Sequence, residues 1–124
     1  MKHENFSRDP LFVDLMNNDP LIKDESEPTQ TATVMIDAAR RLHREFPLIK
    51  LPVLILHGTE DKATNPSGSQ FFYDTAGSTD KTLKLYEGHY HDLLNDVDKE
   101  VVMADIHDWI DARVSVVQTK SVAL

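Results

Sequence analysis

An aspartate and a histidine each follow an apolar, strand-like run in this sequence of 124 residues. Asp61 ends the stretch LPVLILHGTED, and His91 lies in GHYHD just after a second such run. A carboxylate that accepts a hydrogen bond from imidazole Nδ1 holds the ring in the tautomer that leaves Nε2 available as a general base. The same carboxylate stabilises the imidazolium that forms during the reaction. The chain therefore offers an acid and a base in a fixed order, but no nucleophile.

Two predicted strands must position these side chains. Residues 51–56 are apolar on both faces, as expected of a central parallel strand. Residues 82–87 alternate leucine with other types, which predicts a buried leucine face and a wetter opposite face, as at a sheet edge. Strand, crossover helix and strand in this order predict a βαβ unit, whose strand-end loops share one sheet edge. We therefore expect Asp61 and His91 to meet.

Capping residues and apolar spacing predict the helices. Asp9 and Pro10 are a cap and first-turn pair for a short helix, and Asn65 and Pro66 are an equivalent pair between the two strands. Apolar residues at helical spacing predict a second helix that ends at Pro47. The last helix follows Asp96 and Asp98, and we expect its acidic face, with Asp105, Asp108 and Asp111, to be solvated.

Composition excludes several classes of function. Thirteen basic and twenty-one acidic residues give a formal charge of −8, which disfavours nucleic acid and anionic lipid surfaces as partners. The chain has no cysteine, which excludes disulfides and thiolate chemistry and fits a cytoplasmic location. No apolar stretch approaches the roughly 20 residues of a transmembrane helix, and the polar start is unlike a signal peptide.

The motifs resemble those of a known family. The sequence resembles the carboxy-terminal part of α/β-hydrolases of the monoacylglycerol lipase and lysophospholipase-like branch, of serine aminopeptidase S33 type. In that family the aspartate of the His-Gly-x-x-Asp turn is the triad acid, and the histidine before Asp-Leu-Leu is the triad base. The resemblance implies these catalytic roles for Asp61 and His91. Three stretches carry it, at residues 51–62, 77–88 and 90–95, within a match that runs from residue 6 to residue 114.

The resemblance also implies the fold. It implies an α/β fold that is the C-terminal half of an α/β-hydrolase, completed by another chain or by self-association. Residues 1–28 would be the end of the lid and a loop, residues 29–114 the C-terminal part of the core, and residues 115–124 a flexible tail. The lid segment lines the acyl-binding cleft in that family. The expected substrates are small acyl esters such as lysophospholipids or monoacylglycerols.

The family's nucleophile has no counterpart among these 124 residues. It lies in a Gly-x-Ser-x-Gly elbow upstream of the lid, beside the oxyanion hole, and the sequence contains no such elbow. Helix capping explains Ser67 and Ser69 better than nucleophilic attack does. Two strands would also leave one edge of residues 53–56 unpaired. We therefore expect a partner, either an N-terminal hydrolase half or a second copy, and no activity from the chain alone.

Two other functions stay open at this point. The chain could be a non-catalytic remnant or interaction module with the same fold. It could also be a metallohydrolase that uses His89 and His91, although Leu93 replaces the next histidine of that pattern and alternate residues of an extended segment point apart. We expect no resident metal and no cofactor. His57 is interpreted as a packing or surface residue, as are His43 and His107.

Overall fold

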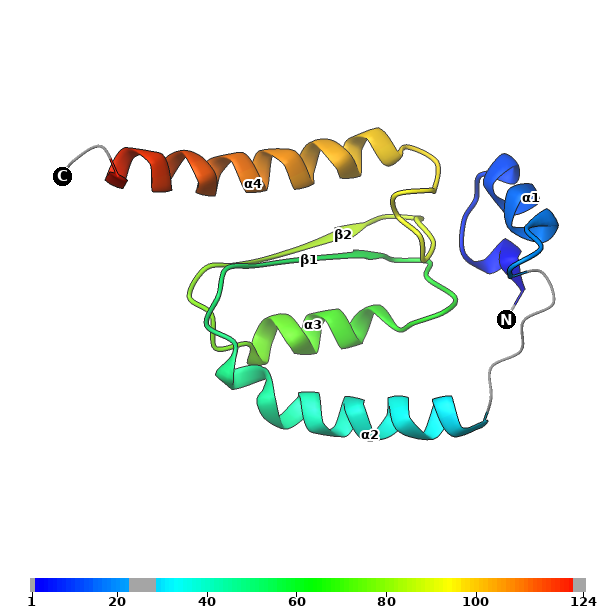
Figure 1. Ribbon diagram of the computed structural model, residues 1–124, viewed down its shortest axis with the longest axis horizontal. Coiled ribbons are helices and arrows are strands. Elements are labelled where there is room, and N and C mark those ends of the chain that lie inside the picture. The colour runs from blue at the N-terminus through cyan, green and yellow to red at the C-terminus, as the bar shows by residue number, and fades with distance from the viewer. Residues whose placement is uncertain (1, 23–28, 122–124) are drawn as a thin grey trace.

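The computed structural model describes residues 2–22 and 29–121, with side chains described for residues 2–22 and 30–114 (Figure 1). The described residues form mainly helices and one short two-stranded sheet. In chain order the elements are the 3-10 helix η1 (His3–Asn5), α1 (Pro10–Asn18), α2 (Thr29–Glu45), the 3-10 helix η2 (Phe46–Leu48), β1 (Val53–Gly58), α3 (Pro66–Thr75), β2 (Lys81–Tyr86) and α4 (Lys99–Ser121).

The two strands are parallel neighbours, as the βαβ prediction requires. The register pairs Val53 with Lys81 and Gly58 with Tyr86 at the two ends. Because the strands run in the same direction, the loops that follow β1 and β2 leave the sheet at the same edge (Figure 1). This topology brings the segments that carry Asp61 and His91 together.

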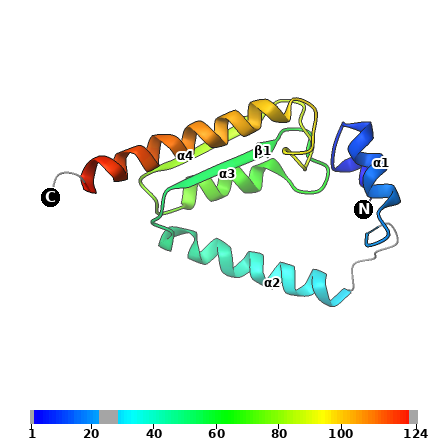
Figure 2. The same cartoon turned by 45° about the horizontal axis from the view of Figure 1, so that its top comes forward.

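Helices cover both faces of this sheet. In both views α4 lies on one face and α3 on the other, while α2 lies beyond α3 (Figures 1 and 2). The helix α1 lies past the carboxyl ends of the strands, next to the loop that joins β2 to α4. The described chain is therefore a layered α/β arrangement with an additional helix at the edge that carries the candidate site.

The predicted helix caps are confirmed. The Asp9 side chain accepts a hydrogen bond from the backbone N–H of Leu11, and Pro10 opens α1. Asn65 caps α3 in the same way, with Pro66 in the first helical position. An Asx side chain at the cap satisfies an N–H group that would otherwise have no acceptor, so these short motifs begin helices without help from distant residues.

The buried face of β2 differs from the prediction. Tyr86 is 6% exposed, whereas Leu85 is 43% exposed. The Tyr86 hydroxyl donates to Asp105 of α4 over 2.7 Å, and Lys84 donates to the same carboxylate. Tyr86 is therefore buried because α4 packs on it and supplies an acceptor, whereas Lys84 on the same face is exposed, so neither face of β2 is buried along its length.

The helix α4 corrects two further predictions. Asp105 does not belong to a solvated acidic face, because it accepts hydrogen bonds from Lys84 and Tyr86, and these donors lower the pKa of its carboxyl group. Residues 115–121, predicted as a flexible tail, continue the helix. No glycine or proline interrupts the sequence there, so the backbone keeps helical hydrogen bonding. Residues 122–124 lie outside the described residues, as do residues 23–28 of the loop predicted at residues 23–29, and Thr29 begins α2.

The hydrophobic core is small. Among the described residues, four apolar side chains are buried, namely Ile55, Ala76, Tyr86 and Val102. The accessible surface is 8977 Å², compared with about 6,700 Å² for an average folded monomer of this mass. The fold therefore leaves much more surface in contact with water than a protein of this size usually does. No helix in residues 2–22 or 29–121 has both the length and the apolar character to cross a bilayer.

Candidate active site

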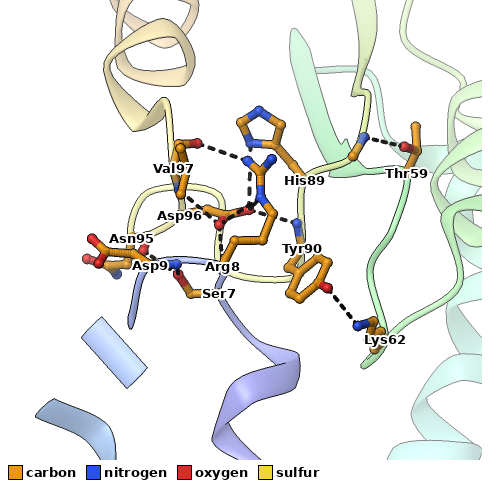
Figure 3. Close-up of polar contacts among 11 residues, drawn as sticks. Ser7, Arg8, Asp9, Thr59, Lys62, His89, Tyr90, Asn95, Asp96 and Val97 are labelled. Carbon is orange, nitrogen blue, oxygen red and sulfur yellow. Dashed lines mark hydrogen bonds and ion pairs between the residues drawn. The ribbon is translucent and has the colours of Figure 1, made fainter. Parts of the chain in front are cut away.

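The loops after β1 and β2 are joined by backbone contacts. The Glu60 N–H donates to the carbonyl of His89 over 3.0 Å. The Thr59 hydroxyl accepts from the Gly88 N–H over 2.8 Å, the bond drawn at Thr59 in Figure 3. A Cβ atom on Gly58 would lie 2.3 Å from the His89 carbonyl oxygen, so the loops approach too closely there for any side chain. These contacts fix the distance between the loop that bears Asp61, the candidate acid, and the loop that bears His91, the candidate base, which we call the acid-bearing and base-bearing loops.

Asp61 and His91 meet as predicted. The His91 Nδ1 lies 2.8 Å from the Asp61 Oδ2. The aspartate side chain is 2% exposed and the histidine side chain 36% exposed. The same Oδ2 accepts from the Thr64 hydroxyl at 2.8 Å, while Oδ1 accepts the backbone N–H groups of Ala63 and Thr64 at 2.7 and 2.9 Å. The carboxylate is thus held by donors from its own loop as well as by the imidazole.

These donors keep Asp61 ionised. Burial raises the pKa of the carboxyl group, but the hydrogen bonds from His91, Thr64 and Ala63 outweigh burial and lower the pKa from 3.8 to about 2. At neutral pH the side chain is therefore a carboxylate and only accepts hydrogen bonds. His91 must then donate from Nδ1, which leaves the lone pair on Nε2. In the described part of the chain, no hydrogen bond occupies that Nε2.

The base-bearing loop is held by a buried carboxylate that belongs to Asp96 (Figure 3). This side chain has no exposed surface, and it accepts from the N–H groups of Arg8 at 2.7 Å, Tyr90 at 2.8 Å and Val97 at 2.9 Å. The Arg8 Nε adds an ion pair at 3.0 Å. Burial raises the pKa of Asp96, but these donors outweigh it and the pKa is lowered. We call these four residues the loop clamp.

The segment before α1 completes the support of the base. The Ser7 hydroxyl donates to the Asn95 carbonyl over 2.7 Å (Figure 3). The Asp92 N–H donates to the Phe6 carbonyl over 2.8 Å. The Phe6 ring meets His91 edge to face, with ring centroids 5.4 Å apart. A segment near the start of the chain thus contacts the loop that bears His91, although 88 positions separate Arg8 from Asp96.

Sequence reasoning does not find the loop clamp. The sequence suggests only that Asp96 precedes the last helix, and it suggests no role for Arg8. Neither residue lies in a periodic pattern, and a salt bridge across so many positions has no local signal. The one available hint is that Asp96 is an acidic residue in the loop close to His91. If such a side chain is buried, its charge needs a partner.

The two histidines of the alternative metal site do not converge. His91 contacts Asp61, whereas the His89 Nδ1 is nearest to Asp96, at 3.8 Å, and is buried without a hydrogen-bond partner. In residues 2–22 and 29–121 no group of three or more histidine, cysteine, aspartate or glutamate side chains could hold a metal ion. The alternation of the extended segment explains the divergence.

One prediction about a histidine is wrong. The sequence indicates a packing or surface role for His57, but its Nε2 lies 3.0 Å from the Asp61 Oδ2 and its Nδ1 lies 2.7 Å from the Ser69 hydroxyl. The Ser67 N–H contacts the Asn65 cap, as expected at a helix start. Ser69 therefore has a specific partner that capping does not predict.

Comparisons with known proteins show the family of this chain. A family model described as serine aminopeptidase, S33, matches residues 1–98. The chain is 33% identical over 110 residues to caffeoylshikimate esterase of Arabidopsis thaliana. This alignment covers 86% of this chain and 33% of that protein. It is 34% identical over 112 residues to monoglyceride lipase of Rattus norvegicus, which covers 89% of this chain and 37% of that protein.

A solved structure shows the same fold. The crystal structure of the Paleococcus ferrophilus monoacylglycerol lipase matches with a TM-score of 0.81 at 32% identity, over 88% of this chain and 42% of that one. The chain thus spans between 33% and 42% of the length of these three proteins. By the family match and the shared fold, the chain belongs to the serine aminopeptidase S33 family of α/β-hydrolases and represents part of a fold of the monoglyceride lipase type.

Proposed function

We propose that this chain supplies the acid and the base of a Ser-His-Asp triad that hydrolyses carboxylic esters. The observation that carries the proposal is the 2.8 Å contact between His91 Nδ1 and the buried Asp61 carboxylate, with the opposite ring nitrogen open. The nucleophilic serine and the oxyanion donors would come from an N-terminal hydrolase portion. A second copy of this chain would bring no Gly-x-Ser-x-Gly elbow, so self-association alone does not complete the triad.

The chemistry follows from the proton positions. As the serine oxygen attacks the ester carbonyl, its proton passes to Nε2 of His91 and the ring becomes an imidazolium. Asp61 stabilises that charge and remains ionised itself. The imidazolium then returns the proton to the departing alcohol, which leaves an acyl-enzyme. Water, activated by the same Nε2, releases the carboxylic acid and restores the serine.

The surface of the chain supports a partner that completes the fold. Among the described residues, β1 has a strand neighbour on one edge only. Large apolar side chains on two helices are also exposed, which is unusual for a surface that stays in water. These side chains are Val34, Met35 and Ile36 on α2, and Val101, Met103, Ile110 and Val114 on α4. An added strand and the helices that follow it would cover both regions.

The helix α1 supports acyl esters as the substrate class. An open depression at this helix is lined mainly by apolar side chains, namely Phe12, Leu15, Met16, Pro20 and Ile22, with Asn18 and Asp19 beside them. A monoglyceride lipase and a monoacylglycerol lipase are among the relatives. We therefore propose monoacylglycerol-like or lysophospholipid-like esters as the substrates. The lack of cysteine fits action in the reducing cytosol.

A chimera tests the proposal. Residues 2–114 would replace the matching C-terminal portion of the Paleococcus ferrophilus lipase, whose remaining portion would provide the missing part of the fold. We expect the isolated chain to leave nitrophenyl esters intact and the chimera to hydrolyse short monoacylglycerols. In the chimera, Asp61→Asn should lower kcat by about 10⁴-fold, because an amide favours the wrong imidazole tautomer. His91→Ala should abolish turnover, and His107→Gln, at an exposed position, should not change it.

Labelling with a fluorophosphonate separates the outcomes. A chimera that is folded by circular dichroism, yet neither turns over nor takes up the label, would refute the proposal and favour a non-catalytic module. Turnover by the isolated chain that disappears in His91→Ala would mean that a nucleophile lies within these residues.

A further inference from the structure

The carboxylate that serves His91 has a second imidazole partner. His57, near the end of β1, places Nε2 3.0 Å from the Asp61 Oδ2, the same oxygen that accepts from His91. Its side chain is 11% exposed, against 36% for His91. The contact between His57 and Asp61 is therefore largely shielded from water, where an interaction with a charged group is strong. The same Nε2 lies 3.4 Å from the Thr64 hydroxyl, which itself donates to the Asp61 Oδ2.

Ser69 sets the tautomer of this second imidazole. An ionised carboxylate can only accept, so the ring nitrogen that faces Asp61 must carry a proton. The other nitrogen of His57, Nδ1, then holds a lone pair, and it lies 2.7 Å from the Ser69 hydroxyl of α3. The hydroxyl therefore donates to His57, and the protonated Nε2 of His57 faces both the Asp61 Oδ2, at 3.0 Å, and the Thr64 hydroxyl, at 3.4 Å. Polar contacts thus run from Ser69 of helix α3 through His57 and Asp61 to His91.

The position of the donors shows what this line does. Oδ2 of Asp61 accepts hydrogen bonds from Thr64 and His91, and the His57 Nε2 lies 3.0 Å from the same oxygen. Thr64 and the backbone donors belong to the acid's own loop, whereas His57 belongs to the strand. Rotation of the carboxylate away from His91 would break the contact with His57 at the same time. The strand thus holds the oxygen where the base needs it.

We propose that His57 is a positioning residue for the Asp61–His91 pair, and that Ser69 orients it by fixing its tautomer. The catalytic meaning of this inference rests on the proposed function, because the orientation of Asp61 matters for turnover only where His91 acts as the base. A residue that only filled space at this position would need neither a proton directed at Asp61 nor a hydroxyl partner on its opposite side.

The tautomer of His91 provides a test that needs no turnover. Nitrogen-15 NMR of the imidazole rings in the full chain, at neutral pH, reports which ring nitrogen carries the proton. We expect His91 to be protonated on Nδ1. In His57→Leu the ratio of Nδ1–H to Nε2–H forms of His91 should fall about tenfold, as expected when an acceptor loses one of the charge-assisted bonds that orient it.

Two further variants keep the test valid if His57→Leu fails to fold. His57→Gln retains an N–H donor for Asp61 and should keep the ratio near that of the unmodified chain. Ser69→Ala removes a single oxygen and should increase the Nδ1–H form of His57. It should also lower the ratio of Nδ1–H to Nε2–H forms of His91, but by less than His57→Leu does. The matched control is His107→Gln, because the His107 side chain is 71% exposed. It should change the tautomer of neither His57 nor His91.

The outcomes separate the two proposals. An unchanged His91 ratio in folded His57→Leu, or in Ser69→Ala where that variant alone folds, would overturn the positioning role. Failure of His57→Gln to restore the ratio that His57→Leu loses would also overturn it, since loss of packing would then explain the effect. An inactive chimera would refute the proposed function and leave the dependence of the His91 tautomer on His57 as measured.

Discussion

Replacement of Asp96 by alanine tests whether the loop clamp supports the candidate base. The substitution leaves three part-buried backbone N–H groups without their acceptor, those of Arg8, Tyr90 and Val97. It also leaves the Arg8 guanidinium, 29% exposed, without the carboxylate it contacts. A buried polar group that loses its partner costs about 1 to 3 kcal/mol, and part of the Arg8 cost is recovered by water. We expect Asp96→Ala to lower the free energy of unfolding by about 3 to 5 kcal/mol.

Urea unfolding followed by circular dichroism measures this loss. Arg8→Gln should cost less than Asp96→Ala, because it removes the ion pair but keeps all three backbone donors and their acceptor. Asp108→Asn, at a side chain that is 83% exposed, should change the unfolding free energy by less than about 0.5 kcal/mol. If Asp96→Ala costs no more than Asp108→Asn, the buried carboxylate does not hold the loop and our account of the clamp is wrong.

Three further predictions concern the site and the elements around it. Folding lowers the pKa of Asp61 from 3.8 to about 2, so this group contributes about 2 kcal/mol to the free energy of unfolding above pH 4. That contribution is lost as the pH falls towards 2. Urea unfolding at a series of pH values should therefore show a steeper fall in the free energy of unfolding for the unmodified chain than for Asp61→Asn. Gly58→Ala should destabilise the chain by about 1 to 3 kcal/mol, since its Cβ would meet backbone carbonyls, whereas Gly68→Ala, with no atom within 4 Å, should raise the melting temperature. Asn65→Ala should cost about 1 kcal/mol in thermal unfolding through loss of the α3 cap, and an unchanged melting temperature would contradict that role.

The acid–base pair is predictable because its signal is local at each end. Each residue follows an apolar run that is typical of a strand, and parallel strands bring their following loops to one edge. The caps at Asp9 and Asn65 are predictable for a similar reason, since an Asx side chain contacts a backbone N–H two residues later. Where the cause of a feature lies within a few residues, or within the topology of one βαβ unit, the sequence is sufficient.

The remaining features depend on what packs against them. The alternation in β2 predicts one buried and one wetter face, but the position of α4 buries Tyr86 and leaves Leu85 exposed. The helical pattern places Asp105 on the same polar face as Asp108 and Asp111, yet its partners come from the sheet. Likewise, nothing near His57 in the sequence indicates that its two ring nitrogens meet Ser69 and Asp61 from different elements.

The chemistry and the stability of this chain depend on different parts of the fold. The groups that hold the acid and the base, from the donors around Asp61 to the loop clamp at Asp96, all belong to the described residues. The apolar burial that stabilises a domain is in contrast scarce, with four buried apolar side chains among the described residues and an accessible surface well above that of a compact monomer. Under the proposed function, an N-terminal hydrolase portion would have two separate tasks, to cover apolar surface and to bring a serine to Nε2 of His91. The contact between His91 and Asp61 is already formed within the described residues, so the proposal requires that portion to supply the serine but not to rearrange this pair.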